Sequence, residues 1–329
     1  MSPNRTLSIT SGETILLIQL RAMGDTLLLT PLIRSLKQSY PEVYIDVLAE
    51  PLPAQVLENN PYIRKVHSAP RRGSSFRKYI PLLRVLRRQR YTLAIDFLST
   101  PGSALLTKLS GAEKRIGYRL RGRTWTYTHP AERRTQPVYN PLTKFDLVKV
   151  LNVEPDSLEL DVFIDAEEER FAENTWCEFG FDDSTAVCAL APWSKRAWRR
   201  WDINAWLEIM RRISVDNEVR WLLFAAEGER AEMHELKNAQ DINIRWAGTK
   251  HLLQAAALMK RCRAMLCADN GLKHIAVAVG LPALTIYTGS DPQVWNPLDD
   301  LRYPFFDLRD LHEKRKLIGK IVEKFKQLC

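Results

Sequence analysis

Short apolar runs alternate along this chain with longer segments in which apolar residues recur every three or four positions. The runs have the length of buried strands and lie at residues 15–20, 43–48, 63–66, 93–97, 187–191, 219–224, 244–246, 264–268 and 283–287. The helical pattern covers residues 26–37, 52–58, 74–90, 101–109, 140–151, 203–213, 229–237, 251–260, 275–280 and 311–328. This alternation predicts an α/β protein with parallel sheets covered by helices, and the pattern occurs once in each half of the chain.

Three segments refine this picture. Pro31 lies inside the first helical segment and lacks a backbone donor, so we expect a kink or a late helix start there. Residues 115–134 contain many arginines with little periodicity, and we expect them to be rich in loops. The acidic segment 152–169 is expected to be the passage between two domains.

The length of the chain indicates more than one hydrophobic core, since 329 residues are natural for two domains. No apolar run is long enough for a spanning helix, and the polar start has no signal-peptide core. The five cysteines form no C-x-x-C pair, and an odd number argues against a disulfide framework. We therefore expect a cytoplasmic protein whose cysteines are free thiols.

The formal net charge of +9 predicts anionic partners. Nucleic acid, an anionic membrane face and a phosphorylated substrate all agree with it, and charge alone does not choose among them. The segment 74–90 concentrates this charge, because its apolar residues recur at helical spacing and arginines occupy the other side.

Unusual residues gather in the turns that follow predicted strands, and in open parallel sheets ligands bind outside the carboxyl ends of strands. The turns lie at residues 21–25, 192–201, 225–229, 248–250, 269–274 and 288–292. Two α/β domains would set such turns opposite one another across a cleft.

The stretch 269–274 is a strand–loop–helix junction where a phosphate can bind the free N–H groups of a helix. Asp269 or Asn270 can cap that helix, and Gly271 lets the backbone approach a ligand. A plain capped helix explains the same residues. His274 can donate a hydrogen bond to a phosphate oxygen, although a lone histidine is as often structural.

Two other turns carry charge suited to chemistry. Asp25 follows the first strand and can act as a general base towards a hydroxyl, but capping alone also explains it. Arg199 and Arg200 lie in a loop with three tryptophans and can clamp a diphosphate, whereas a solvated charge run is the simpler interpretation.

Several chemistries lack their motifs in this sequence. Neither the G-x-G-x-x-G fingerprint nor the G-x-x-x-x-G-K-[ST] loop is present, which disfavours nicotinamide redox chemistry and P-loop phosphoryl transfer. D-x-D and clustered His, Cys and carboxylate ligands are also missing, so we expect no required metal or cofactor.

Three segments in the same order resemble the ADP-heptose lipopolysaccharide heptosyltransferases, glycosyltransferase family nine. Residues 21–32 resemble the opening x-x-x-G-D-x-x-x-x-x-P, residues 199–201 resemble K-R-W or K-H-W, and residues 269–274 resemble D-[TS]-G-x-x-H with the continuation 276–292. Asn270 and Arg199 depart from the usual threonine or serine and lysine, and Lys273 is less familiar at its position than a small or apolar residue. These differences concern the donor more than the reaction type.

The resemblance implies a GT-B fold of two Rossmann-like domains whose parallel sheets face each other across a cleft. Residues 1–165 would bind the acceptor, residues 166–310 the nucleotide sugar, and the helix in 311–329 would pack back towards the first domain. The reaction would be inverting and metal-independent. The resemblance makes Asp25 the base and gives donor-site positions to Ser194, Arg199, Glu229, Thr249, Asp269, Asn270, Gly271 and His274.

We therefore expect heptose transfer from ADP-L-glycero-D-manno-heptose to Kdo-lipid A or a heptosyl core at the inner face of the inner membrane. Basic residues of the first domain would meet the anionic acceptor and membrane surface: Arg21, Arg71, Arg72 and Arg115. A GT-B transferase using another nucleotide sugar is the first alternative. A non-catalytic nucleic-acid-binding protein is the second, and no nucleic acid partner is expected under the main hypothesis.

Overall fold

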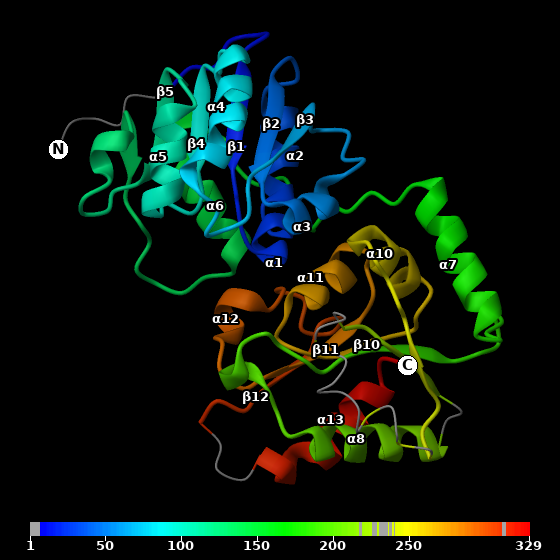
Figure 1. Cartoon of the computed structure of the whole chain (residues 1–329). Coiled ribbons are helices and arrows are strands. Elements are labelled where there is room, and N and C mark those ends of the chain that lie inside the picture. The colour runs from blue at the N-terminus through cyan, green and yellow to red at the C-terminus, as the bar shows by residue number, and fades with distance from the viewer. Residues whose placement is uncertain are drawn as a thin grey trace. The chain divides into compact units, whose positions relative to one another are not determined.

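The computed structural model describes residues 7–216, 219–225, 229, 236, 239, 241–310 and 314–329. In these residues the chain forms two compact units, one ending at Phe163 and the other beginning at Ile164 (Figure 1). Each unit contains a six-stranded parallel sheet with helices packed on it. The predicted α/β class, with one sheet in each half of the chain, is confirmed.

The first unit has the strand order β3-β2-β1-β4-β5-β6. Its strands are β1 Thr14–Ile18, β2 Tyr44–Ala49, β3 Lys65–Ser68, β4 Leu93–Asp96, β5 Lys114–Tyr118 and β6 His129–Ala131. Its helices are α1 Met23–Leu27, α2 Thr30–Ser39, α3 Pro51–Ala54, α4 Tyr79–Arg88, α5 Pro101–Leu109 and α6 Asn140–Val148. This is the strand order of a Rossmann sheet. The strand order reverses between β1 and β4, while the strands themselves stay parallel.

The central strand β1 illustrates why these residues form a buried sheet. Its apolar run Ile15–Ile18 is fully buried and pairs in parallel with β2 on one side and β4 on the other. A strand covered on both faces by helices is apolar throughout rather than alternating. The expected effect of Pro31 is confirmed, because the helical segment divides and α2 begins at Thr30 with the proline in its first turn, where no donor is lost.

The second unit repeats this topology with the order β12-β11-β10-β7-β8-β9, which reverses between β7 and β10. Its strands are β7 Val187–Ala191, β8 Arg220–Leu223, β9 Ile244–Trp246, β10 Met265–Ala268, β11 Ala283–Tyr287 and β12 Phe305–Asp307. Its helices are α7 Ala166–Glu178, α8 Ile203–Asp216, α10 Leu252–Lys260, α11 Gly271–Ala278, α12 Pro292–Trp295 and α13 Ile318–Lys326.

Helix α13 packs its apolar face into the core of the second unit. Ile318, Ile321 and Phe325 are buried in the same cluster as residues of β7 and α8. The ring of Phe325 stacks on that of Trp221 with centroids 5.7 Å apart. Packing of this segment towards the first domain stays a prediction.

Strands at or beside the sheet edges account for the main errors of the sequence-based assignment. The prediction that 115–134 is loop-rich was wrong at its two ends, because β5 and β6 pair there at the edge of the first sheet. β5 contributes a single fully buried aliphatic side chain, Ile116, so its pairing leaves little apolar pattern in the sequence. β12, which has three residues and no buried side chain, was also missed. The helix expected at 229–237 lies largely outside the described residues.

Candidate active site

The loops after β7 and β10 meet at the point where the second sheet reverses its strand order. The side chain of Asn270 joins them, because its Nδ2 donates hydrogen bonds of 2.9 Å to the carbonyls of both Ala191 and Trp193. Its Oδ1 accepts from the backbone N–H of Lys273 at 3.2 Å, so Asn270 is the N-cap of α11. A ligand-binding crevice is expected at such a reversal in an open α/β sheet.

Asp269 is the centre of the polar contacts in this region. It follows β10 directly and is buried. Its carboxylate accepts a hydrogen bond from Lys273 Nζ at 2.8 Å and forms an ion pair with Arg199 Nη1 at 2.9 Å. The Ser290 hydroxyl donates to the same carboxylate. Burial alone would raise the pKa of Asp269, but the Lys273 charge, assisted by Ser290 and Arg199, lowers it to about 2. Asp269 is therefore an ionised group that orients its donors.

Lys273, which the sequence marked only as a departure from the family pattern, is a central member of the site. Its side chain is fully buried, and its ammonium donates to Asp269, to the Tyr287 hydroxyl at 2.8 Å and to the carbonyl of Trp295 at 3.0 Å. These contacts use all the donors of an ammonium group. The lysine thus links the ends of β10 and β11 to α12. Its spacing of one helical turn from Asp269 was the available signal.

Four buried polar atoms near these strand ends have no hydrogen-bond partner within the part of the chain that the structure describes. They are Trp193 Nε1, Arg199 Nε, His274 Nδ1 and Thr288 Oγ1. The residues follow β7, β10 and β11, which are neighbours in the sheet. Since buried polar groups in native proteins are nearly always paired, such a concentration indicates a place for a polar ligand.

His274 lies one turn into α11 and is buried against Trp295, with ring centroids 6.3 Å apart. Burial, together with the charge of Lys273, holds its pKa well below the usual range, and Asp269 opposes this only in part. The imidazole is therefore neutral at physiological pH and can offer one donor and one acceptor.

The cationic loop after β7 is held by aromatic stacking. The guanidinium of Arg199 lies 4.7 Å from the ring centre of Trp198, and that of Arg200 lies 4.5 Å from the ring centre of Trp193. Arg200 Nε also donates to the carbonyl of the buried Ser194 at 2.8 Å. The side chains of two arginines are thus already held in place beside the strand end. They lose less conformational entropy on binding an anion than freely rotating side chains would lose.

Gly289 permits the close approach of Trp198. A Cβ atom built on Gly289 would lie 2.2 Å from a ring carbon of Trp198 and 2.8 Å from its carbonyl oxygen. The loop after β11 therefore needs glycine at this position for the Trp198–Arg199 loop to pack against it.

The remaining predicted donor residues follow the outer strands of the same sheet. Glu229 comes after β8, Thr249 comes after β9, and both side chains are half-buried. Gly271 is the first residue of α11. The neighbours of Glu229 in sequence lie outside the described residues, so its role stays a prediction, as does that of Thr249.

In the first unit Asp25 lies in the first turn of α1, after β1, and its side chain is partly exposed. Lys144 of α6 brings its buried ammonium to 3.8 Å from Asp25 Oδ1 and also donates to Gln19 Oε1 at 3.4 Å. Burial lowers the pKa of Lys144, and Asp25 opposes this shift. Nothing in the sequence indicated this partner, because 119 residues separate the two.

A pocket of 470 Å³ opens in the first unit after β1, β2 and β4. Arg21 and Arg72 line it together with Glu50 and apolar side chains from α4, α5 and the preceding loop. Arg71 is exposed and does not line this pocket. Arg115 does not join this group, because it lies near the start of β5 and its guanidinium donates to backbone carbonyls, including that of Thr126 at 2.8 Å.

No group of three or more His, Cys, Asp or Glu side chains in the described ranges is arranged to hold a metal ion. No helix in the described part of the chain has both the length and the apolar composition needed to cross a bilayer.

Comparisons with known proteins agree with this geometry. The family model "Glycosyltransferase family 9 (heptosyltransferase)" matches residues 80–316. Lipopolysaccharide heptosyltransferase 3 of Escherichia coli K12 is 24% identical over 298 residues, which cover 84% of this chain and 83% of that protein.

Two solved structures resemble the whole chain. A family 9 glycosyl transferase from Veillonella parvula has a TM-score of 0.88 at 17% identity, with 98% of each chain covered. The E. coli ADP-heptose lps heptosyltransferase II has a TM-score of 0.79 at 21% identity, covering 96% of this chain and 98% of that one. These likenesses confirm the predicted GT-B class of two Rossmann-like sheets.

Proposed function

Because the chain belongs to glycosyltransferase family 9, the heptosyltransferases, and is therefore a glycosyltransferase, we propose that it transfers heptose from ADP-L-glycero-D-manno-heptose to an inner-core acceptor of lipopolysaccharide. The observation that carries the proposal is the set of unpaired buried polar atoms around the Asp269 cluster. The names of two relatives, a lipopolysaccharide heptosyltransferase and an ADP-heptose lps heptosyltransferase, support the choice of donor and acceptor.

The donor is bound by the second unit. Arg199 presents its unpaired Nε to a phosphate oxygen, while its Nη1 stays on Asp269. The first N–H groups of α11 point towards the same anion. The neutral His274 donates a hydrogen bond to an oxygen atom of the nucleotide sugar. Ser194 after the central β7, and Glu229 and Thr249 after β8 and β9 nearer the sheet edge, complete the site.

Transfer is a single displacement with inversion. Asp25 takes the proton of the acceptor hydroxyl, the oxygen forms a bond to the anomeric carbon, and the bond from that carbon to the diphosphate breaks. ADP leaves with the bonding electron pair, and Arg199 and the helix N–H groups stabilise its charge. These fixed cations and dipoles support a reaction that requires no metal ion.

The acceptor is bound by the first unit. The pocket that Arg21 and Arg72 line combines cations with an apolar wall that includes Phe76 and Leu105. This combination suits a sugar acid or a phosphorylated sugar, since guanidinium groups bind carboxylates and phosphates in bidentate geometry. Kdo-lipid A and an extended heptosyl core both carry such groups, and the pocket does not choose between them.

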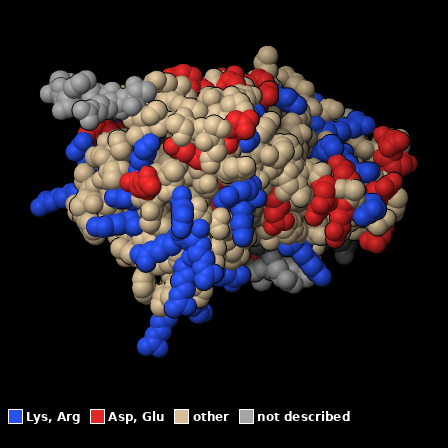
Figure 2. All heavy atoms as spheres, turned by 90° about the horizontal axis from the view of Figure 1, so that it is seen from above, with Lys and Arg blue, Asp and Glu red and all other residues tan. Residues whose placement is uncertain are grey.

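The surface of α4 supports the proposal of peripheral attachment to the anionic inner face of the inner membrane. Its basic side chains are exposed, as predicted, and Leu83 and Leu86 are buried beneath them. Phe76 and Trp125 are more than half exposed near this helix and α5. Figure 2 shows Lys and Arg side chains gathered on one part of the face seen from above. Each such cation contributes about 1 kcal/mol at an anionic surface.

Vesicle co-sedimentation tests this attachment. Vesicles containing anionic lipid should retain the protein at low salt and release it at high salt, because surface charges are screened. Replacing the exposed Arg84 and Arg88 by Gln should weaken retention, whereas the same changes at the exposed Arg211 and Arg212 of the second unit should not. Equal loss in both pairs would contradict a specific role for α4.

The function is tested by turnover of the purified protein with ADP-heptose and defined truncated acceptors, followed by linkage analysis. Thermal shift with ADP, UDP and GDP addresses the alternative donors, because a nucleotide at 100 times its dissociation constant stabilises by about 2.7 kcal/mol. Selective stabilisation by ADP and transfer of heptose are expected. Selective stabilisation by UDP or GDP would overturn the donor assignment.

A further inference from the structure

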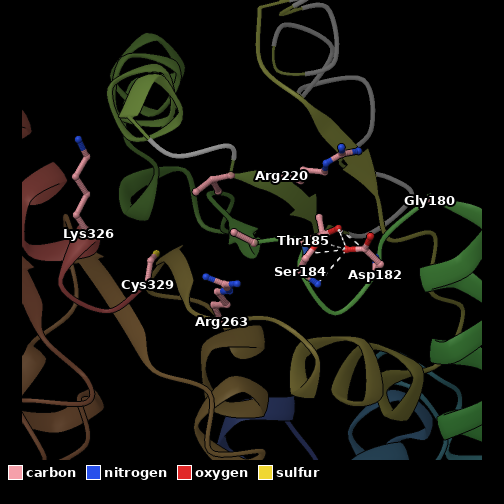
Figure 3. Close-up of a pocket in the computed structure, with 10 residues that line it drawn as sticks. Gly180, Asp182, Ser184, Thr185, Arg220, Arg263, Lys326 and Cys329 are labelled. Carbon is pink, nitrogen blue, oxygen red and sulfur yellow. Dashed lines mark hydrogen bonds between the residues drawn. The ribbon is translucent and has the colours of Figure 1, made fainter.

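A second pocket, of 540 Å³, opens in the second unit away from the site described above (Figure 3). Arg220 is the first residue of β8, and Ala186 and Arg263 come just before β7 and β10. Parallel strands begin at one edge of a sheet and end at the other. The pocket therefore lies at the edge opposite to Asp269, and the proposed transfer reaction makes no use of it.

This pocket contains one half of a thiol pair. Cys329 lines it and is exposed, while Cys188 is fully buried in β7. The two sulfur atoms are 3.4 Å apart. A disulfide bond has an S–S length of about 2.05 Å, so a small movement of the exposed residue would join them.

The surroundings of Cys329 favour its thiolate. The contact between the two thiols, together with the charge of Arg263, lowers the pKa of the Cys329 thiol although burial opposes the shift. The pKa of Cys188 is raised by the same contact and by burial. Cys329 is thus the nucleophile of the pair, and Cys188 is its proton-bearing neighbour.

Other charged groups around the pocket reinforce this assignment. Arg220 and Lys326 line it together with Arg263. The one carboxylate among the lining residues, that of Asp182, accepts hydrogen bonds of 2.7 Å from the hydroxyls of both Ser184 and Thr185 (Figure 3). The pocket therefore presents mainly positive charge to Cys329.

The other cysteines lack this combination. Burial raises the pKa of both Cys262 and Cys267, the latter to about 11, which makes them poor nucleophiles. Cys177 is exposed but has no thiol near it among the described residues. Cys188 and Cys329 therefore form the pair in which an accessible thiol has a resolving partner.

We propose that Cys188 and Cys329 are a peroxide-sensitive dithiol that closes to a disulfide between β7 and the segment after α13. The Cys329 thiolate attacks a peroxide oxygen, the O–O bond breaks, and the leaving alkoxide or hydroxide takes a proton, giving a sulfenic acid. The sulfur of Cys188 then attacks that of Cys329, and its proton leaves with the hydroxide as water. Two thiols and one peroxide thus yield one disulfide, one alcohol or water molecule, and one further water.

The test uses the purified full chain, reduced and then treated with hydrogen peroxide, and requires no transferase activity. Thiols are counted after unfolding, and peptides are mapped by mass spectrometry without reduction. Three of the five thiols should remain, and a linked peptide should contain Cys188 and Cys329. The oxidised protein should melt at a higher temperature than the reduced protein, because the disulfide constrains the unfolded chain.

Matched variants separate this proposal from general oxidation. Cys329→Ser, at an exposed position, should abolish the linked peptide, and Cys177→Ser should leave it unchanged. Cys188→Ala should leave a sulfenic or further oxidised Cys329. Arg263→Gln should slow disulfide formation several-fold. Retention of all thiols, oxidation confined to Cys177, or oxidation of Cys329 beyond sulfenic acid in the unaltered chain would each overturn the proposal.

Discussion

The ammonium of Lys273 lies 2.8 Å from the carboxylate of Asp269, and both side chains are buried at the carboxyl end of β10. This ion pair explains how a carboxylate and an arginine can remain fixed at a strand end. Lys273 neutralises part of the charge of Asp269, and Asp269 in turn holds Nη1 of Arg199. The Nε of Arg199 is left for a ligand.

The pair predicts a large cost for removing one partner. Lys273→Met should lower the free energy of unfolding by about 3–5 kcal/mol, because it leaves a buried carboxylate without its main partner. Ser290→Ala, which removes a hydrogen bond from the same carboxylate, should cost less. Urea denaturation measures both. A loss below 1 kcal/mol in Lys273→Met would contradict the importance of the pair.

Arg199 is predicted to bind the diphosphate. Arg199→Ala should weaken ADP binding roughly 10- to 100-fold, since a hydrogen bond to a charged group is worth about 1.5–3 kcal/mol. Arg196→Ala, an exposed arginine in the same loop, is the control and should bind ADP normally. Calorimetric titration with ADP makes the comparison, and equal affinities of the two variants would exclude a direct role for Arg199.

Gly289 is predicted to control the position of the Trp198 loop. Gly289→Ala should weaken ADP binding, because the new methyl group would meet both the ring and the backbone of Trp198. The exposed Gly102, where a Cβ atom meets nothing within 4 Å, provides the control. In the double variant with Trp198→Ala and Gly289→Ala, the contact between the new methyl group and the indole ring is removed, but the contact with the carbonyl oxygen of residue 198 remains. Unchanged ADP affinity in Gly289→Ala would show that the loop adapts.

His274 gives the protein a predicted pH dependence. Its pKa is lower in the folded than in the unfolded chain, so the unfolded state binds the additional proton below about pH 6.5. Stability is therefore lost as pH falls through that value towards the folded pKa. Between pH 7.5 and 5.5 the unaltered protein should lose roughly 1 kcal/mol more than His274→Gln.

Urea denaturation at both pH values checks this difference. Lys273, Asp269 and Arg199 surround the imidazole, and the carboxyl group of Asp269, whose pKa is lowered to about 2, stays ionised throughout this range. The variant removes only the titration of His274, so equal pH dependence in the two proteins would contradict a buried neutral imidazole.

Local signals in the sequence predicted much of the fold. The apolar runs located the central strands, Asn270 was one of two candidate caps for α11, and Pro31 indicated the break before α2. These features depend on neighbouring residues. The edge strands β6 and β12, and β5 beside β6, depend instead on pairing with distant strands, and their sequences carry little periodicity.

The candidate site, like the fold, was predicted in part from the sequence. Asp25, Arg199 and Asp269 stood out because each follows a strand in a polar turn. Lys144 did not stand out, and Lys273 was noted only as a departure from the family pattern. The ion pairs that these buried lysines form with Asp25 and Asp269 depend on the folded structure. Arg115 was predicted to bind the acceptor because of its charge. Its hydrogen bonds to backbone carbonyls could not be predicted, because they depend on the position of β5 in the fold.

The central claim is that this chain transfers a glycosyl group with Asp25 as the base, and turnover of Asp25→Asn tests it most directly. Heptose transfer from ADP-heptose should fall at least about 100-fold, the low end of general base contributions, while ADP affinity stays within a factor of about two. Glu42→Gln, an exposed acid of the same unit, should remain fully active. Undiminished transfer by Asp25→Asn would contradict the account.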